Sequence, residues 1–78
     1  METNILKTLN DIFISVFKDK TLKINLDTKQ TDIPLWDSLN NIVLISEIEK
    51  IFNVKFSLDD IYELKSVQDI VNIIKRKK

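Results

Sequence analysis

Apolar residues near the N-terminus recur with the spacing of an α-helix. Four of them follow one another at intervals of three or four residues, which places them on one side of a helix. These four are Ile5, Leu9, Ile12 and Val16, and Leu6, Phe13 and Phe17 lie on the adjoining strip. The pattern breaks where lysine and aspartate alternate. It predicts a first amphipathic helix over about residues 2–18.

Residues 19–37 keep no regular apolar spacing over their whole length. Leu22, Ile24 and Leu26 alternate with other residues, which suits a short extended stretch, whereas the Asp-Thr and Thr-Asp pairs and Pro34 favour turns. We expect a long ordered loop, a feature that is uncommon in small domains and often functional. Four apolar residues are expected to pin this loop to the core: Leu26, Ile33, Leu35 and Trp36.

A second helix is predicted over about residues 38–52. Asp37 is a good N-cap, because its side chain can accept hydrogen bonds from amides of the first turn. On a helical wheel, five apolar residues gather on the side that must face the core, and they are Leu44, Ile45, Ile48, Ile51 and Phe52. Three others fall on the outer side near the helix start: Leu39, Ile42 and Val43. The helix therefore has a second apolar patch beside its N-terminus.

Two serine–acid motifs predict the starts of two further helices. Ser57 precedes a pair of aspartates and Ser66 precedes Asp69, which suits an N-cap followed by acid in the first turn. They predict a short third helix over about residues 57–64 and a fourth helix over about residues 67–76. The fourth helix has a core stripe, formed by Val67, Ile70, Val71 and Ile74 with Ile73 at its flank.

Together these elements predict an all-α fold with a single domain, residues 1–78. The architecture is a four-helix bundle with a short third helix and a long ordered loop between the first two helices. The chain has no glycine, so turns with positive φ fall to Asn or Asp, and Asn53 is expected to end the second helix. Phe56 and Tyr62 are expected in the core. Three asparagines are expected at the surface: Asn4, Asn10 and Asn72.

The composition removes most catalytic chemistry. The chain has no histidine and no cysteine, so the usual general base, the common nucleophilic triads and thiolate or imidazole metal sites cannot be built within it. No apolar run approaches the roughly 20 residues of a membrane-spanning helix, and the N-terminus lacks the features of a signal peptide. We therefore expect a non-catalytic, soluble cytoplasmic protein without a metal and without membrane attachment.

The net charge is zero, but the charges are unevenly distributed. Residues 37–64 carry six acidic and two basic side chains, a net charge of minus four, and residues 65–78 carry five basic and one acidic, a net charge of plus four. The basic tail, residues 75–78, fits a nucleic-acid contact or a solvated helix end, and the second is favoured because cations suit a helix C-terminus. The other acids are interpreted as solvated surface rather than a metal cluster: Glu47, Glu49, Asp59, Asp60 and Glu63.

The chemically informative stretch is Asp37-Ser38-Leu39, at the start of the second helix. The first amides of a helix are free and its dipole is positive there, so a phosphate on the Ser38 hydroxyl would be well placed. The sequence offers no base to deprotonate this serine, so another protein must supply any chemistry on it. By itself the tripeptide is also typical of simple helix capping.

In its full setting the tripeptide resembles the modification site of the acyl carrier protein family. The similarity covers nearly the whole chain, including the long loop, Phe52 followed by Asn-Val-Lys-Phe, the short acidic third helix and the Ser66-Val67-Gln68-Asp69-Ile70 start of the last helix. It implies that Ser38, with Asp37 beside it, receives a 4'-phosphopantetheine arm from coenzyme A through a phosphopantetheinyl transferase that uses Mg²⁺. Acyl or aminoacyl cargo is then carried as a thioester on the thiol of the arm, which explains the missing cysteine.

The resemblance also implies where partner enzymes dock. In this family the transferase and the acyl-loading and condensing enzymes bind the second helix, which corresponds here to Leu39, Asn40, Asn41, Ile42, Val43, Ser46 and Glu47. The helical wheel independently places the apolar members of this set outside the core, which suits a small, transient interface. The alternative is that they pack under the long loop. We expect a monomer with no nucleic-acid partner.

Two features depart from the family's pattern. Family members often have glycine before Asp-Ser-Leu, where this chain has Trp36, which we interpret as a core-facing or loop-pinning aromatic. Many members are strongly acidic, whereas this chain is neutral, so docking should depend less on total charge. Both features favour a specialised carrier over a housekeeping one, and the cargo stays open among fatty acyl, polyketide, aminoacyl and sugar-modifying pathways.

Two other functions remain as alternatives to the carrier. The first is an unmodified helical protein-interaction module that has the carrier fold, which attachment of phosphopantetheine to Ser38 would exclude. The second is a small nucleic-acid binder, for which salt-dependent binding would be lost on deletion of residues 75–78.

Overall fold

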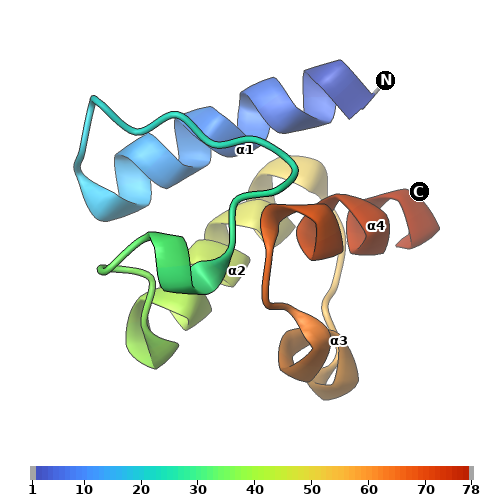
Figure 1. Ribbon diagram of the computed structural model, residues 1–78. Coiled ribbons are helices and arrows are strands. Elements are labelled where there is room, and N and C mark those ends of the chain that lie inside the picture. The colour runs from blue at the N-terminus through green and yellow to red at the C-terminus, as the bar shows by residue number, and fades with distance from the viewer. Residues whose placement is uncertain (1, 78) are drawn as a thin grey trace.

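The computed structural model describes residues 2–77, with side chains from residue 4 onward. Their helices are α1 Glu2–Phe17, the short 3₁₀ turn η1 Gln30–Asp32, α2 Ser38–Phe52, α3 Leu58–Glu63 and α4 Val67–Lys77 (Figure 1). The all-α, four-helix fold predicted from the sequence is confirmed, and no α-helix end differs from its expected position by more than one residue. In this part of the chain, every helix is too short or too polar to cross a lipid bilayer.

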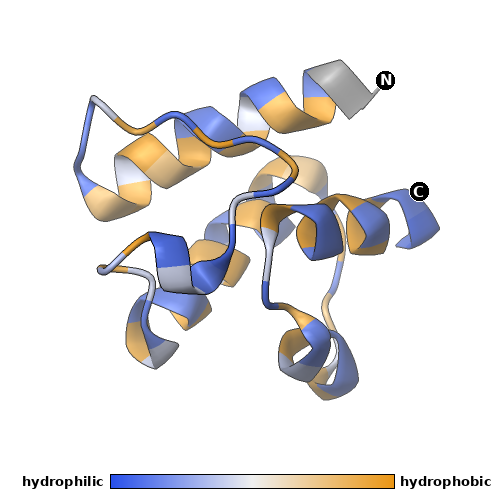
Figure 2. Ribbon diagram, viewed as in Figure 1, coloured by the Kyte–Doolittle hydropathy of each residue, from blue (hydrophilic) through white to orange (hydrophobic). Residues whose placement is uncertain are grey.

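Apolar residues of the three longer helices meet in one core. Its fully buried members include Leu9 and Phe13 of α1, Leu44 and Ile48 of α2, and Ile70, Val71 and Ile74 of α4. Hydrophobic colour covers much of α1 and the inner turns of α4, whereas the last turn of α4 is hydrophilic (Figure 2). Burial of one large apolar side chain stabilises a fold by about 1.5–3 kcal/mol, so this cluster holds the helices together.

The loop between α1 and α2 is tied to the rest of the molecule by hydrogen bonds. The side chain of Asn10 in α1 donates to the Leu22 carbonyl at 3.4 Å and accepts from the Ile24 amide at 2.7 Å. Further along, Lys29 forms an isolated antiparallel bridge with Ser66, just before α4. Asn10 is therefore a partly buried loop anchor, and the expectation that it lies at the surface was wrong. The loop backbone needs such partners because residues 22–25 form no regular structure of their own.

Three apolar residues that were expected in the core are exposed: Leu35, Ile51 and Tyr62. Leu35 points outward because its neighbour Trp36 is buried and fills the core at this point of the loop. Ile51 lies at the edge of the apolar stripe of α2, beside an open groove. Tyr62 is on the outer side of the short helix α3, which is anchored from its end by the buried Leu64.

Two helices are followed by a residue in the left-handed conformation although the chain has no glycine. Asn53 ends α2 with φ 56° and ψ 50°, as the sequence predicted, and its amide donates to the Glu49 carbonyl. After α1 the same region is occupied by Lys18, with φ 54°. That position was not predicted, because lysine has no special tolerance for left-handed geometry.

Candidate functional site

The start of α2 is capped by Asp37, and Ser38 is the first residue inside the helix. Asp37 has extended backbone geometry, and its Oδ1 accepts a hydrogen bond from the Asn40 amide at 2.8 Å. Its carbonyl oxygen accepts from the Asn41 amide, also at 2.8 Å. This confirms Asp37 as the N-cap. Because the cap role is filled by the preceding residue, the Ser38 side chain is not needed to close the helix.

The Ser38 hydroxyl is exposed and has no hydrogen-bond partner among the described residues. Its side chain lies at the surface, and within residues 2–77 no group forms a hydrogen bond with its Oγ. The first four amides of a helix lack acceptors inside the helix, and Asp37 serves those of Asn40 and Asn41. The amides of Ser38 and Leu39 are left for solvent or a bound group. The site therefore combines an accessible hydroxyl with a locally positive helix end, which suits a phosphate ester.

A buried tryptophan fixes the chain immediately before this site. Trp36 packs edge-on against Phe13 of α1, with ring centroids 5.0 Å apart and an interplanar angle of 90°. Its Nε1 donates to Asn41 Oδ1 at 2.7 Å, so the indole is satisfied in the core and tied to the first turn of α2. The interpretation of Trp36 as a core-facing, loop-pinning aromatic is confirmed. The bond to Asn41 was not predicted, because a spacing of five residues across a helix start has no sequence signature.

Two side chains hold the carbonyl groups of the same segment. Asn40 Nδ2 donates to the Leu35 carbonyl at 2.7 Å, and Gln30 Nε2 donates to the Trp36 carbonyl at 3.1 Å. Consecutive backbone carbonyls ahead of the Asp37 cap are thus held from α2 on one side and from η1 on the other. The entry to the helix, and with it Ser38, has a fixed direction relative to the core.

The residues expected on the partner surface do not all face solvent. Leu39, Ile42 and Val43 are exposed, with Leu39 at 73%. Exposure of all three is incompatible with the alternative that they pack under the long loop. Ser46 is exposed and Glu47 half-buried, while Asn40 is half-buried by its bond to the loop. Asn41 is the exception, because it is buried as the partner of Trp36 and is not available to another protein.

The acidic residues of the middle region include one that is not solvated. Asp60 is buried at the start of α3, where it accepts from the Ser57 amide at 2.9 Å and pairs with Arg76 and Lys77 of α4 at 3.0 Å each. The Ser57 amide, with help from Lys77, lowers the pKa of Asp60 from 3.8 to about 2. The interpretation of Asp60 as solvated surface was therefore wrong. Arg76 and Lys77 are exposed at the end of α4, as expected for a solvated helix end, but both also pair with Asp60 and so tie this end to α3.

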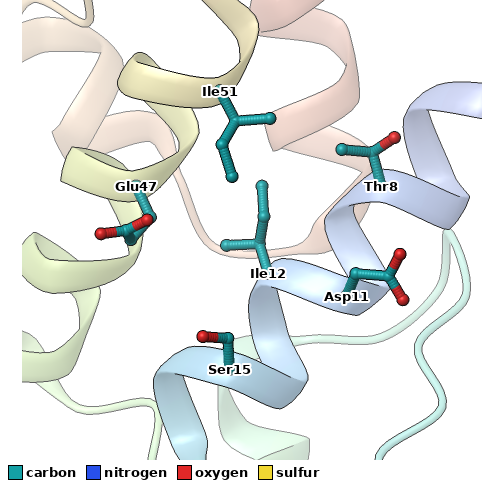
Figure 3. Close-up of a pocket in the computed structure, with 6 residues that line it drawn as sticks. All are labelled: Thr8, Asp11, Ile12, Ser15, Glu47 and Ile51. Carbon is teal, nitrogen blue, oxygen red and sulfur yellow. The ribbon is translucent and has the colours of Figure 1, made fainter.

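In the described part of the chain, neither these contacts nor the remaining acids make up a metal-binding cluster. Among residues 2–77, no three Asp or Glu side chains gather to hold a metal ion. A shallow groove of about 270 Å³ lies between α1 and α2, and Ile12 and Ile51 point toward each other across it (Figure 3). Its rim carries Asp11 and Glu47, with no histidine or cysteine to act beside them. The exposed Ser38 hydroxyl is thus the best-defined chemical site.

Comparison with known proteins shows which family and fold the chain resembles. The family described as "Phosphopantetheine attachment site" matches residues 7–74. The solution structure of a holo acyl carrier protein from Geobacter metallireducens is 35% identical, covering 92% of this chain and 83% of that one, with a TM-score of 0.85. The acyl carrier protein of Thermotoga maritima has the same fold at 16% identity, covering 97% and 88%, with a TM-score of 0.85. No curated protein sequence is significantly similar to this chain.

Proposed function

This chain belongs to the acyl carrier protein family, and we propose that Ser38 is the residue to which its phosphopantetheine prosthetic group is attached. The chain then carries acyl or aminoacyl intermediates between enzymes of fatty-acid, polyketide or related biosynthesis. The observation that carries the proposal is an exposed hydroxyl, without a bond to any described residue, at the first position inside a capped helix. An unmodified interaction module would need no such free hydroxyl at this position.

The residues at the helix start fit the group chemically. A phosphate ester on Ser38 lies where the helix dipole is positive, which favours negative charge by about 0.3–1 kcal/mol at an exposed helix end. The free amides of Ser38 and Leu39 are suitable donors to its oxygens. Asp37 keeps the first turn closed by holding the Asn40 amide. When attached, the group supplies a thiol for carrying cargo, in a chain that has no cysteine of its own.

The chain contributes position rather than catalysis. It has no histidine to activate the serine, so a phosphopantetheinyl transferase must supply both the base and the coenzyme A substrate. We propose that this transferase, and the loading and condensing enzymes after it, contact the first turns of α2. The contacting residues are Leu39, Asn40, Ile42, Val43, Ser46 and Glu47, and the buried Asn41 is not among them.

The test uses the absence of cysteine. The chain, prepared in its unmodified form, is incubated with coenzyme A, Mg²⁺ and a broad-specificity phosphopantetheinyl transferase. Its thiols are titrated before and after, once free coenzyme A, which carries its own thiol, has been removed. The chain starts with no thiol, and we expect it to gain one, together with one phosphopantetheine unit of mass. Ser38→Ala should gain neither. A wild-type chain that stays without a thiol under these conditions would contradict the proposal and favour the unmodified interaction module.

A further inference from the structure

Resting on the proposed function, we infer that enzymes acting at Ser38 dock through a nearly uncharged apolar surface that lies on both sides of this serine. We call it the docking face and define it as Pro34, Leu35, Leu39, Ile42 and Val43, all of which are exposed. It combines the apolar residues of α2 with Pro34 and Leu35, which lie in the loop before Ser38. The partner that fits it presents apolar, uncharged residues, one of which enters a pocket beside Leu35.

Charged residues are rare in the segment that carries the docking face. From Ile33 to Ser46, Asp37 is the single charged residue, although 31% of the whole chain is charged. Oδ1 of the Asp37 carboxylate accepts a hydrogen bond from the Asn40 amide. A basic partner surface would find few acidic side chains to pair with here, whereas an uncharged apolar surface would be complementary to it. Charge complementarity therefore selects a partner that associates mainly by burial of apolar area.

A pocket lies beside Leu35, in the loop that precedes Ser38. It measures about 260 Å³ and is lined mainly by apolar side chains from the end of α1 and from the loop: Phe17, Leu22, Ile33, Pro34 and Leu35. This volume is smaller than typical small-molecule sites and suits a single apolar side chain. Two acids complete its lining, and both carboxylates bond to their own loop, Asp19 to Thr21 and Asp32 to the Lys29 amide.

The backbone that carries Leu35 is held in place by the residues around it. Its carbonyl accepts from Asn40 Nδ2 at 2.7 Å, and the next residue, Trp36, is locked in the core. The exposed Leu35 side chain is therefore held on a fixed backbone. Little backbone freedom is lost when a partner covers it, which favours its use as an interface anchor.

Ile51 provides a matched control within the same chain. Its side chain is 53% exposed, the same fraction as that of Leu35. It lies thirteen residues beyond Ser38 on α2, about 20 Å along the helix. Its surroundings are the acidic rim of the groove in Figure 3, with Asp11 and Glu47. Exposure and residue type are thus nearly equal, while the position relative to Ser38 differs.

The experiment measures the kinetics of modification. Initial rates are recorded with the broad-specificity transferase at saturating coenzyme A, so that salt effects on coenzyme binding do not enter, while the concentration of the chain is varied. Wild type, Leu35→Gln and Ile51→Gln are compared, and circular dichroism checks that each is folded. Wild type is also measured at low and high salt, from about 0.05 M to about 0.5 M NaCl, a range over which exposed charges are progressively screened.

The inference predicts that Leu35→Gln raises KM for the chain at least about fivefold, with kcat little changed, and that Ile51→Gln stays within about twofold. It also predicts that salt changes the wild-type KM by less than about twofold. A tenfold rise of KM with salt, or equal KM for the two variants, would overturn it. A wild-type dimer that Leu35→Gln dissociates would also overturn it, because the docking face would then bind a second copy of the chain. A wild type that is never modified rejects the proposed function itself.

Discussion

Helices α2 and α3 begin with the same two residue types but use them in opposite ways. At α3, Ser57 is the cap itself: its hydroxyl accepts from the Asp60 amide at 3.1 Å, and Asp60 accepts in return from the Ser57 amide. At α2, Asp37 is the cap and Ser38 follows it inside the helix. A serine at the cap position thus uses its hydroxyl to accept a first-turn amide, whereas a serine one residue later does not.

The start of α4 extends the comparison. Ser66 Oγ accepts from the Asp69 amide at 3.2 Å, so this serine is also used by its own backbone. At both helix starts with a capping serine, the serine hydroxyl is bound by the backbone of its own helix. The start of α3 is also held by Arg76 and Lys77, which pair with Asp60. Of these three helix starts, only that of α2 has a serine whose hydroxyl is not bonded to any described residue. Five stability measurements sharpen this contrast.

The largest effect is expected at the anchor of the α2 start. Trp36→Ala removes a buried aromatic side chain and leaves Asn41 Oδ1 without its donor, so it should lower the free energy of unfolding by about 3–5 kcal/mol. Such a loss approaches the whole stability of a domain of this size. Trp36→Phe, which keeps most of the ring, should cost about 1–2 kcal/mol. Urea denaturation measures both, and equal losses for the two variants would contradict the anchor role.

The next effect is expected at Asp60, on the α3 side. Asp60→Asn removes the charge that faces Arg76 and Lys77 and should lower the free energy of unfolding by about 1–2 kcal/mol near neutral pH. The estimate is modest because Arg76 remains largely exposed. Urea denaturation checks it, with Asp59→Asn as the control at an exposed neighbour in the same turn.

The same variant predicts a pH dependence. The pKa of Asp60 is lowered in the folded chain, from 3.8 to about 2, so its stabilising effect is complete above about pH 4 and is lost as the pH falls toward about 2. The stability difference between wild type and Asp60→Asn should therefore shrink on acidification through this window. A difference that stays constant between about pH 5 and about pH 2 would show that the charge of Asp60 is not what stabilises the contact.

Smaller effects are expected at the caps. Asp37→Ala and Ser57→Ala each remove a side chain that accepts a first-turn amide, and each should cost about 1 kcal/mol of unfolding free energy. Asp37→Asn, which keeps an acceptor oxygen, should recover most of the loss. If Asp37→Ala proves neutral in thermal or urea unfolding, Asp37 is not the cap that frees Ser38.

The smallest effect is expected at Ser38. Its side chain forms no bond among residues 2–77, and alanine is a good helix former, so Ser38→Ala should change the free energy of unfolding by less than about 0.5 kcal/mol. The comparison with Ser57→Ala, measured in the same way, is the informative quantity. A loss of about 1 kcal/mol at Ser38 would mean that its hydroxyl is used by the fold.

The features that could be predicted from the sequence depend on local chemistry. The apolar stripe of α4, the cap at Asp37 and the left-handed Asn53 each follow from residue type and spacing within one helix. The free position of Ser38 follows in the same way, because it requires only that the cap lie one residue earlier. Such features need no knowledge of how the helices pack.

The features that could not be predicted join distant residues through packing. Asp60 meets Arg76 sixteen residues away, and Asn10 meets Ile24 fourteen residues away. The exposure of Leu35 depends on Trp36 taking the core position beside α1. Helical periodicity ranks residues by the side of a helix and carries no information on which of two neighbours in a loop fills the core.

Of the three serines at helix starts, Ser38 has a hydroxyl with no partner among the described residues, whereas Ser57 and Ser66 each accept a hydrogen bond from a backbone amide. The most direct measurement is the mapping of phosphopantetheine by fragmentation mass spectrometry, after transferase treatment of a chain that keeps Ser38, Ser57 and Ser66. The account predicts modification of Ser38 alone. Modification of Ser57 or Ser66, or a modified chain with Ser38 untouched, would contradict it.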